Sequence, residues 1–165
     1  MSPQSTLVLG LGNTLLQDEA LGVRAVEALH ARLGALEGVE LLDGGTLGLD
    51  LLPYLSEARS VMILDAVHFD AEPGTLIRLE GDAIPAALKV KMSMHQVGLN
   101  DLLAATAFRG KTPERLVLWG MQPGGLDWGL DLTAPVAERL DALVDRAEAE
   151  LRMWLSDSAS ASTEG

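Results

Sequence analysis

Four side chains that could do chemistry stand at the ends of predicted strands or at the start of a predicted helix: Glu19, Asp43, Asp65 and His95. Two carboxylates and one imidazole form a ligand set that suits Zn²⁺, Ni²⁺ or a similar divalent ion and leaves positions open for water or a substrate ligand. We therefore predict a metal site formed by Glu19, Asp65 and His95. Asp43 precedes two glycines, so it is interpreted equally well as a functional acid or as a residue that shapes a turn.

Purely structural interpretations of the same stretches stay open. Asp18 could be the N-cap of a helix, and Glu19 a first-turn acid that the helix dipole favours. His95 falls in the first turn of a helix that Ser93 would cap, where the dipole keeps the imidazole neutral, as metal ligation requires. His68 is a further candidate ligand, although strand alternation would place it on the face opposite to Asp65.

The elements that must position these residues alternate along the chain. Apolar runs predict strands and 3.6-residue spacing predicts helices; the strands are 5–13, 39–45, 60–67, 72–81 and 115–123, and the helices are 20–33, 47–57, one from Ser93 and one from a Thr133 cap. The pattern predicts a three-layer α/β/α sandwich with a mainly parallel, twisted sheet and an antiparallel edge strand. Ligands bind such sheets at the carboxyl ends of the strands.

Composition limits the classes of function. The chain has 165 residues, a formal net charge of −12 and no cysteine. We predict one α/β domain over 1–155 and a disordered tail over 156–165, which carries little apolar surface. The charge argues against nucleic acid and anionic membrane as partners. The lack of cysteine excludes thiol proteases and thiolate zinc sites, and no signal peptide or membrane span is recognised. We expect a cytoplasmic monomer.

Other motifs fit the first acidic loop less well. Gly10 and Gly12 begin a dinucleotide-binding fingerprint, but Leu15 stands where its third small residue belongs. Asp18 and Glu19 would repel a pyrophosphate. No nucleophile elbow, zinc-protease helix or phosphate-loop lysine is present, so a cation explains the acidic loop better than a phosphate does.

In order and spacing, five stretches resemble the nickel-iron hydrogenase maturation endopeptidases: "LGLGNTLLQDEALGVRAVEAL", "LLDGGTLGLDLL", "VMILDAV", "SMHQVGLNDLL" and "LVLWGMQP". The likeness covers about residues 6–150. It implies an α/β/α sandwich that trims the C-terminal extension from the precursor of the hydrogenase large subunit after nickel insertion. It also implies that Glu19, Asp65 and His95 bind the metal. Asp43, in the Asp-Gly-Gly motif, is implicated in activity, and for this reason the family is grouped with aspartic-type peptidases.

Two mechanisms follow from this resemblance. In the preferred one, the trio recognises nickel that the precursor's cysteines already hold, and Asp43 is the general base for water. In the other, the trio keeps its own zinc-like ion, which activates water. A metal-sensing or chaperone-like binding module without peptidase activity is the alternative function, and a dinucleotide-binding enzyme ranks third.

Overall fold

A computed structural model describes residues 5–45, 48–84, 103–107, 110 and 112–163. Its centre is a five-stranded sheet with the order β2-β1-β3-β5-β4. The bounds are β1 Thr6–Leu11, β2 Val39–Gly45, β3 Ser60–Ala66, β4 Leu76–Glu80 and β5 Arg115–Met121. All neighbouring strands pair in parallel except β4, which lies antiparallel to β5 at one edge. The predicted mainly parallel sheet with an antiparallel edge strand is confirmed.

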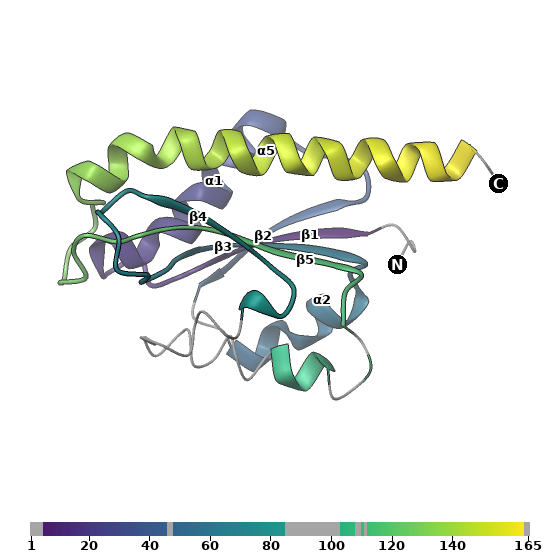
Figure 1. The fold of residues 1–165 in the computed structure, drawn as a ribbon, viewed down its shortest axis with the longest axis horizontal. Coiled ribbons are helices and arrows are strands. Elements are labelled where there is room, and N and C mark those ends of the chain that lie inside the picture. The colour runs from purple at the N-terminus through teal and green to yellow at the C-terminus, as the bar shows by residue number, and fades with distance from the viewer. Residues whose placement is uncertain (1–4, 46–47, 85–102, 108–109, 111, 164–165) are drawn as a thin grey trace.

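Helices cover both faces of this sheet. Helix α1 (Leu21–Leu33) and helix α5 (Ala134–Thr163) lie over one face, and α2 (Leu52–Glu57) lies over the other (Figure 1). Successive side chains of β3 explain the two layers, because they point to opposite faces. Met62 and Leu64 join the core under α1 and α5, whereas Val61 and Ile63 join the core on the α2 side. The three-layer prediction is therefore confirmed.

The predicted periodicity of α1 identifies half of its buried residues. Gly22, Val26 and Leu29 are buried, and Leu33 packs against the same core while half-buried. The helix ends at Gly34, which has a positive φ of 62° and donates its N–H to the carbonyl of His30. Glycine at this position is favoured because a Cβ disfavours such a backbone.

Helix α5 starts where the sequence predicts and ends later than it predicts. Val136, Leu143, Ala147 and Leu151 are buried on one stripe, with Leu140 partly buried. The helix continues through Thr163, into the segment from residue 156 for which the sequence predicts a disordered tail. Alanine and serine let the hydrogen-bonded turns continue without an apolar face. In the described part of the chain, no helix combines the length and apolar character needed to cross a membrane.

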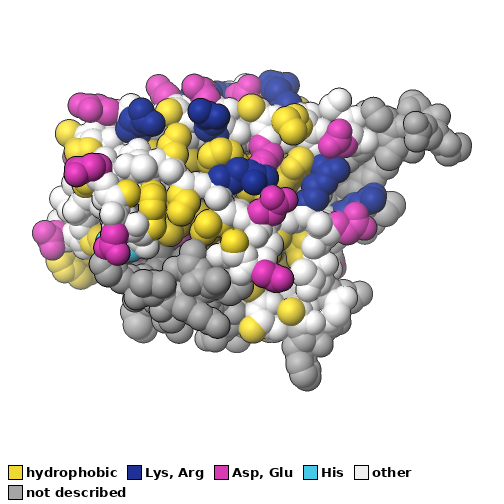
Figure 2. All heavy atoms as spheres, in the orientation of Figure 1, with side chains coloured by type: hydrophobic (Ala, Val, Ile, Leu, Met, Phe, Trp, Pro, Cys, Tyr) yellow, Lys and Arg dark blue, Asp and Glu magenta, His cyan; other side chains and the backbone are white. Residues whose placement is uncertain are grey.

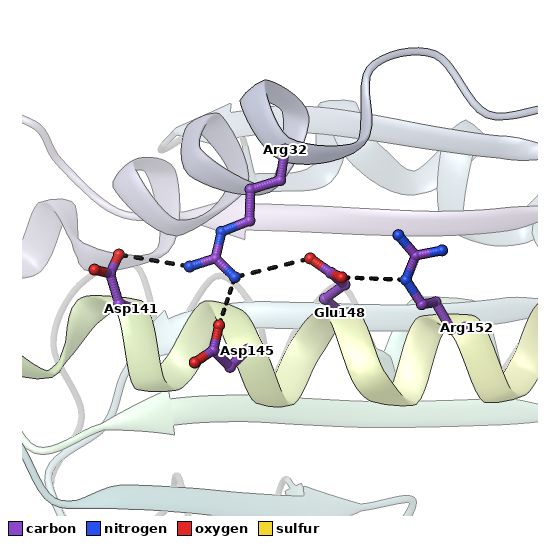
Figure 3. A network of polar contacts seen from close by, with 5 residues as sticks. All are labelled: Arg32, Asp141, Asp145, Glu148 and Arg152. Atoms are coloured by element: carbon purple, nitrogen blue, oxygen red, sulfur yellow. Dashed lines mark hydrogen bonds and ion pairs between the residues drawn. The ribbon is translucent and has the colours of Figure 1, made fainter.

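Ion pairs connect the C-terminal end of α1 to α5 (Figure 3). The Arg32 guanidinium lies 2.5 Å from an Asp145 carboxylate oxygen, 3.6 Å from one of Asp141 and 3.8 Å from one of Glu148. The hydrogen bond to Asp145 raises the pKa of Arg32 above its ordinary value. Glu148 also pairs with Arg152 one turn later. All these groups are at least partly open to water, so each pair contributes little to stability.

Candidate active site

Three glycines bring the start of α1 onto the carboxyl edge of the sheet. A Cβ on Gly10 would lie 2.3 Å from the Gly22 carbonyl oxygen, and one on Gly12 only 1.7 Å from that of Glu19. A Cβ on Gly22 would lie 2.0 Å from the Leu64 carbonyl oxygen. Backbone therefore packs directly on backbone at this edge. Close packing of a helix on strands accounts for the Gly-x-Gly sequence without a bound phosphate.

This packing buries two of the predicted metal ligands on adjoining elements. Glu19 lies in the 3₁₀ helix η1 (Gln17–Ala20), which leads into α1 and contacts β3. Its residue is 9% exposed, and Asp65, near the end of β3, is fully buried. One carboxylate oxygen of Asp65 accepts a hydrogen bond of 2.8 Å from the Ala66 N–H. Buried carboxylates need hydrogen bonds, a counter-charge or a metal ion, so this edge offers oxygen donors of the kind a divalent cation uses.

The third predicted ligand, His95, lies outside the described residues, as does the helix start predicted at Ser93. Within the described ranges, no three His, Cys, Asp or Glu side chains gather in a way that could hold a metal ion. The assignment of Glu19, Asp65 and His95 as one metal-binding trio therefore stays a prediction.

Asp43 reaches the same edge on the other face of the sheet. It is in register with Gly10 of β1, and Gly10 is in register with Leu64, the neighbour of Asp65 in β3. Residues in register share a face, and their chain neighbours point the opposite way, so the side chains of Asp43 and Asp65 lie on opposite faces. The exposed Asp43 carboxylate accepts a 3.0 Å hydrogen bond from Gly45 N–H. This Asx turn shows that Asp43 shapes the chain, as one interpretation proposed.

Asp18 differs from Glu19 although the two are neighbours. It is fully buried, and its two carboxylate oxygens accept four hydrogen bonds, from the N–H groups of Gly124, Gly125 and Thr133 and from the Thr133 hydroxyl, at 2.5 to 2.9 Å. The N-cap interpretation of Asp18 is wrong, because none of the described side chains caps η1 or α1. Asp18 instead fixes the loop between β5 and α5, residues 122–133, which we call the β5–α5 loop.

Thr133 is the residue before α5, and its carbonyl accepts from Ala137 N–H at 2.8 Å. The predicted start of this helix is thus correct, but the Thr133 hydroxyl donates to Asp18. The same contact therefore orients α5 and fixes the segment that carries Glu19. Its partners lie more than a hundred residues apart in sequence, and residue spacing gave no signal for it.

Gln122 is a second polar anchor that the sequence did not reveal. This buried residue follows β5 and accepts the N–H of Phe69 at 2.8 Å, which secures the segment after β3. Its amide nitrogen lies 3.4 Å from Nδ1 of His68. Since β3 ends at Ala66, the strand alternation that placed His68 opposite Asp65 does not extend to it. In the described part of the chain, His68 has this contact and is not grouped with other metal-ligating residues.

Comparisons with known proteins agree with this architecture. The hydrogenase maturation protease family model matches residues 23–150. The hydrogenase expression/formation protein HupD of Rhizobium leguminosarum bv. viciae is 45% identical over 150 residues, covering 90% of this chain and 74% of the relative. The hydrogenase 2 maturation protease of Escherichia coli is 42% identical, covering 88% of this chain and 90% of the relative.

Comparison with solved structures also identifies hydrogenase maturation proteases as similar proteins. The hydrogenase maturating endopeptidase HybD from Escherichia coli superposes with a TM-score of 0.86 at 41% identity, covering 90% of this chain and 93% of that one. The nickel-iron hydrogenase maturation protease HybD from Thermococcus kodakarensis gives 0.73 at 26% identity, covering 88% and 97%. These likenesses favour a peptidase over a binding module or a dinucleotide enzyme. The chain belongs to the hydrogenase maturation protease family.

Proposed function

We propose that this protease removes a C-terminal extension from the large-subunit precursor of a nickel-iron hydrogenase after nickel has been inserted. Family membership supports the reaction class, hydrolysis of a peptide bond. The observation that carries the assignment of the site is the burial of Glu19 and Asp65 on adjoining elements at the carboxyl edge of the sheet.

In this proposal Glu19, Asp65 and His95 recognise nickel that belongs to the substrate. Cysteine thiolates of the precursor hold the metal more firmly than carboxylates and an imidazole would, because thiolates are the softer ligands. The enzyme then contacts a metal that it does not need to extract. Such contact reports that assembly is complete and fixes the precursor beside the enzyme before its peptide bond is cut.

Asp43 is the proposed general base for the attacking water, which corresponds to the aspartic-type grouping. Its support is an exposed carboxylate at the same edge as Asp65. The opposite-face position means that the scissile bond would lie over the end of the sheet, near the end of β1. Substrate would then be placed between the metal-recognising acids and the base.

The direct experiment measures the intact mass of a nickel-loaded large-subunit precursor after mixing with the protease, with nickel-free precursor in parallel. We expect a C-terminal peptide to be lost from the loaded form alone. Cleavage of both forms would replace nickel recognition with a resident catalytic metal. Cleavage of neither form would contradict the proposed substrate.

Isosteric variants test the two acids in the same assay. Glu19→Gln and Asp65→Asn keep side-chain shape and remove the charge, so both should lower the cleavage rate at least about a hundredfold if they contact the metal. Glu27→Gln is the matched control, because Glu27 is an exposed acid of α1. If Glu19→Gln cleaves the precursor at the wild-type rate and its thermal stability is unchanged, Glu19 is not part of the active site.

A separate variant distinguishes the two roles of Asp43. In Asp43→Asn, the amide oxygen can still accept from Gly45 N–H, so the Asx turn is preserved while the base is lost. We expect the cleavage rate to fall about a hundredfold or more. If Asp43→Asn cleaves normally and Asp43→Ala does not, Asp43 is a turn residue and the base lies elsewhere.

A further inference from the structure

An exposed apolar surface adjoins the candidate active site. Five large hydrophobic side chains are exposed among the residues that the structure describes, and three of them belong to two neighbouring segments. Trp128 is 79% exposed, Leu130 65% and Leu15 48%. Trp128 and Leu130 stand on the β5–α5 loop, and Leu15 stands four residues before Glu19. We call these three residues the Trp128 surface.

Backbone hydrogen bonds bring the two segments together. The Gly129 N–H donates to the Leu15 carbonyl at 2.9 Å, and the Gln17 N–H donates to the Gly129 carbonyl at 3.0 Å. Leu16 and Gly129 form a parallel bridge. Residue 129 lies between Trp128 and Leu130, so both flank the strand-like contact that also carries Leu15.

Side-chain hydrogen bonds also hold the β5–α5 loop against the segment that carries Leu15. Gln17 adopts a positive φ of 47°, and its side-chain carbonyl accepts the Asp127 N–H at 3.3 Å. Asp18 adds the four buried hydrogen bonds described above. A backbone held this firmly loses little further entropy when a partner covers the apolar side chains that it carries. The Trp128 surface is therefore pre-organised for binding.

Charge indicates the chemistry of the partner. Asp127 and Asp131, both exposed, flank Trp128 and Leu130 in the loop. Figure 2 shows hydrophobic and acidic side chains next to one another at the end of the molecule where Figure 1 places this loop. An apolar patch with an acidic rim fits a partner segment with apolar residues between lysines or arginines. A second copy of this acidic chain fits less well, because like charges repel.

We propose that the Trp128 surface is a docking site for the hydrogenase large-subunit precursor, and that it binds an apolar segment flanked by basic residues. This inference rests on the proposed function and adds where the substrate is held outside the metal-recognising acids. Asp18 accepts hydrogen bonds from loop residues 124 and 125. Glu19 is the next residue in the chain after Asp18, so the same short stretch fixes both the loop and Glu19. Docking at the loop therefore sets the precursor's position relative to Glu19.

The test compares Trp128→Ala/Leu130→Ala with Met153→Ala in the full chain. Met153 is the matched control, because it is 64% exposed and lies far along α5. Binding of fluorescently labelled nickel-loaded precursor is measured by anisotropy, and cleavage of the same mixture is measured by intact mass. Removal of a central tryptophan anchor should weaken binding about tenfold or more. At precursor concentrations below KM, the cleavage rate should fall by a similar factor, because weaker binding of the precursor lowers kcat/KM.

Each outcome decides the proposal. Tenfold weaker binding by the double variant, with Met153→Ala like wild type, supports it. Equal binding by all three proteins, or equal weakening in both variants, overturns it. A dimer in sedimentation that only the double variant loses would assign the surface to a second copy instead. Wild-type binding without any mass loss would contradict the proposed function, while the affinities would still decide the docking site.

The acidic rim has its own variant. Asp127→Asn/Asp131→Asn should weaken binding several-fold at low salt and flatten the dependence of affinity on salt. A salt dependence equal to that of wild type would show that the rim does not select the partner.

Discussion

The two ends of α1 are attached to the molecule by different kinds of contact. At its N-terminal end, Gly22 touches the backbone of β1 and β3, and Asp18 of the preceding η1 accepts four buried hydrogen bonds. At its C-terminal end, Arg32 forms exposed ion pairs with α5 and Gly34 closes the last turn. Both ends are polar in sequence, so composition does not separate them. Burial does.

The fold is more rigid at the N-terminal end of α1 than at its C-terminal end. Buried hydrogen bonds and backbone contacts hold only one geometry, whereas solvated ion pairs tolerate rearrangement. The rigid end is the one that carries Glu19 and contacts the β5–α5 loop. Pre-organisation is thus concentrated beside the candidate active site, where a displacement of about 1 Å can cost a large factor in rate.

The largest effect is expected from Asp18→Ala. Four donors would lose a charged acceptor inside the protein, so the free energy of unfolding should fall by about 4 kcal/mol. Urea denaturation measures it. Asp18→Asn is the control and should lose less, because one acceptor oxygen remains. If the free energy of unfolding falls by less than about 1 kcal/mol, the contacts at the N-terminal end of α1 stabilise the protein no more than those at its C-terminal end.

Gly22→Ala comes next and tests the backbone contacts alone. The new Cβ would lie 2.0 Å from the Leu64 carbonyl oxygen, so α1 must move away from the sheet. We expect a loss of about 3 kcal/mol in the free energy of unfolding, typical of overpacking against backbone. Cleavage of the precursor should fall as well, because Glu19 moves with the helix start. Stability equal to that of wild type would show that α1 can shift at little cost, so that its N-terminal end is no more rigid than its C-terminal end.

Gly34→Ala probes the other end and should be milder. A Cβ at this position would have no atom of the described residues within 4 Å, yet φ is 62°. The Gly34 ψ of −151° completes a backbone conformation that is essentially restricted to glycine. The loss therefore comes from backbone strain alone, about 2 kcal/mol by urea denaturation. Gly81→Ala, with φ of 55° and the same open surroundings, is the matched position away from α1. A much larger loss at Gly34 than at Gly81 would indicate that the C-terminal end of α1 is also tightly constrained.

Arg32→Ala should have the smallest effect. Its partners are solvated, so the urea midpoint should move slightly at low salt and match wild type at about 1 M salt, where the Debye length is roughly 3 Å. The cleavage rate should equal that of wild type. A loss of stability that does not depend on salt would show that the Arg32 ion pairs, like the hydrogen bonds of Asp18, are shielded from solvent.

Local patterns predicted the elements well because hydrophobic runs and periodicity are local properties. The bounds of β2 were predicted correctly. Of the residues predicted to be buried on α1, all but the half-buried Leu33 are buried, but the buried Leu21, Val23 and Ala25 were missed. The end of α5 was missed because a helix that continues from a packed segment needs no apolar face of its own.

The site was predictable only in part. Glu19 and Asp65 could be assigned to one edge because parallel strands end together there. The face of Asp43 could not, since it depends on the register of β2 with Gly10. The role of Asp18 was also hidden, because its acceptors serve donors 106 to 115 residues later. Contacts at such separation are set by the topology of the whole sheet.

The length of α5 makes its C-terminal end a suitable place to attach a label or a tether. The helix begins beside the Asp18 contacts and runs for 30 residues toward the opposite end of the molecule (Figure 1). At about 1.5 Å per residue, its last turn stands roughly 45 Å from its first. A dye, an affinity tag or a surface tether attached at that last turn would therefore report encounters with a large precursor while leaving the carboxyl edge of the sheet unobstructed.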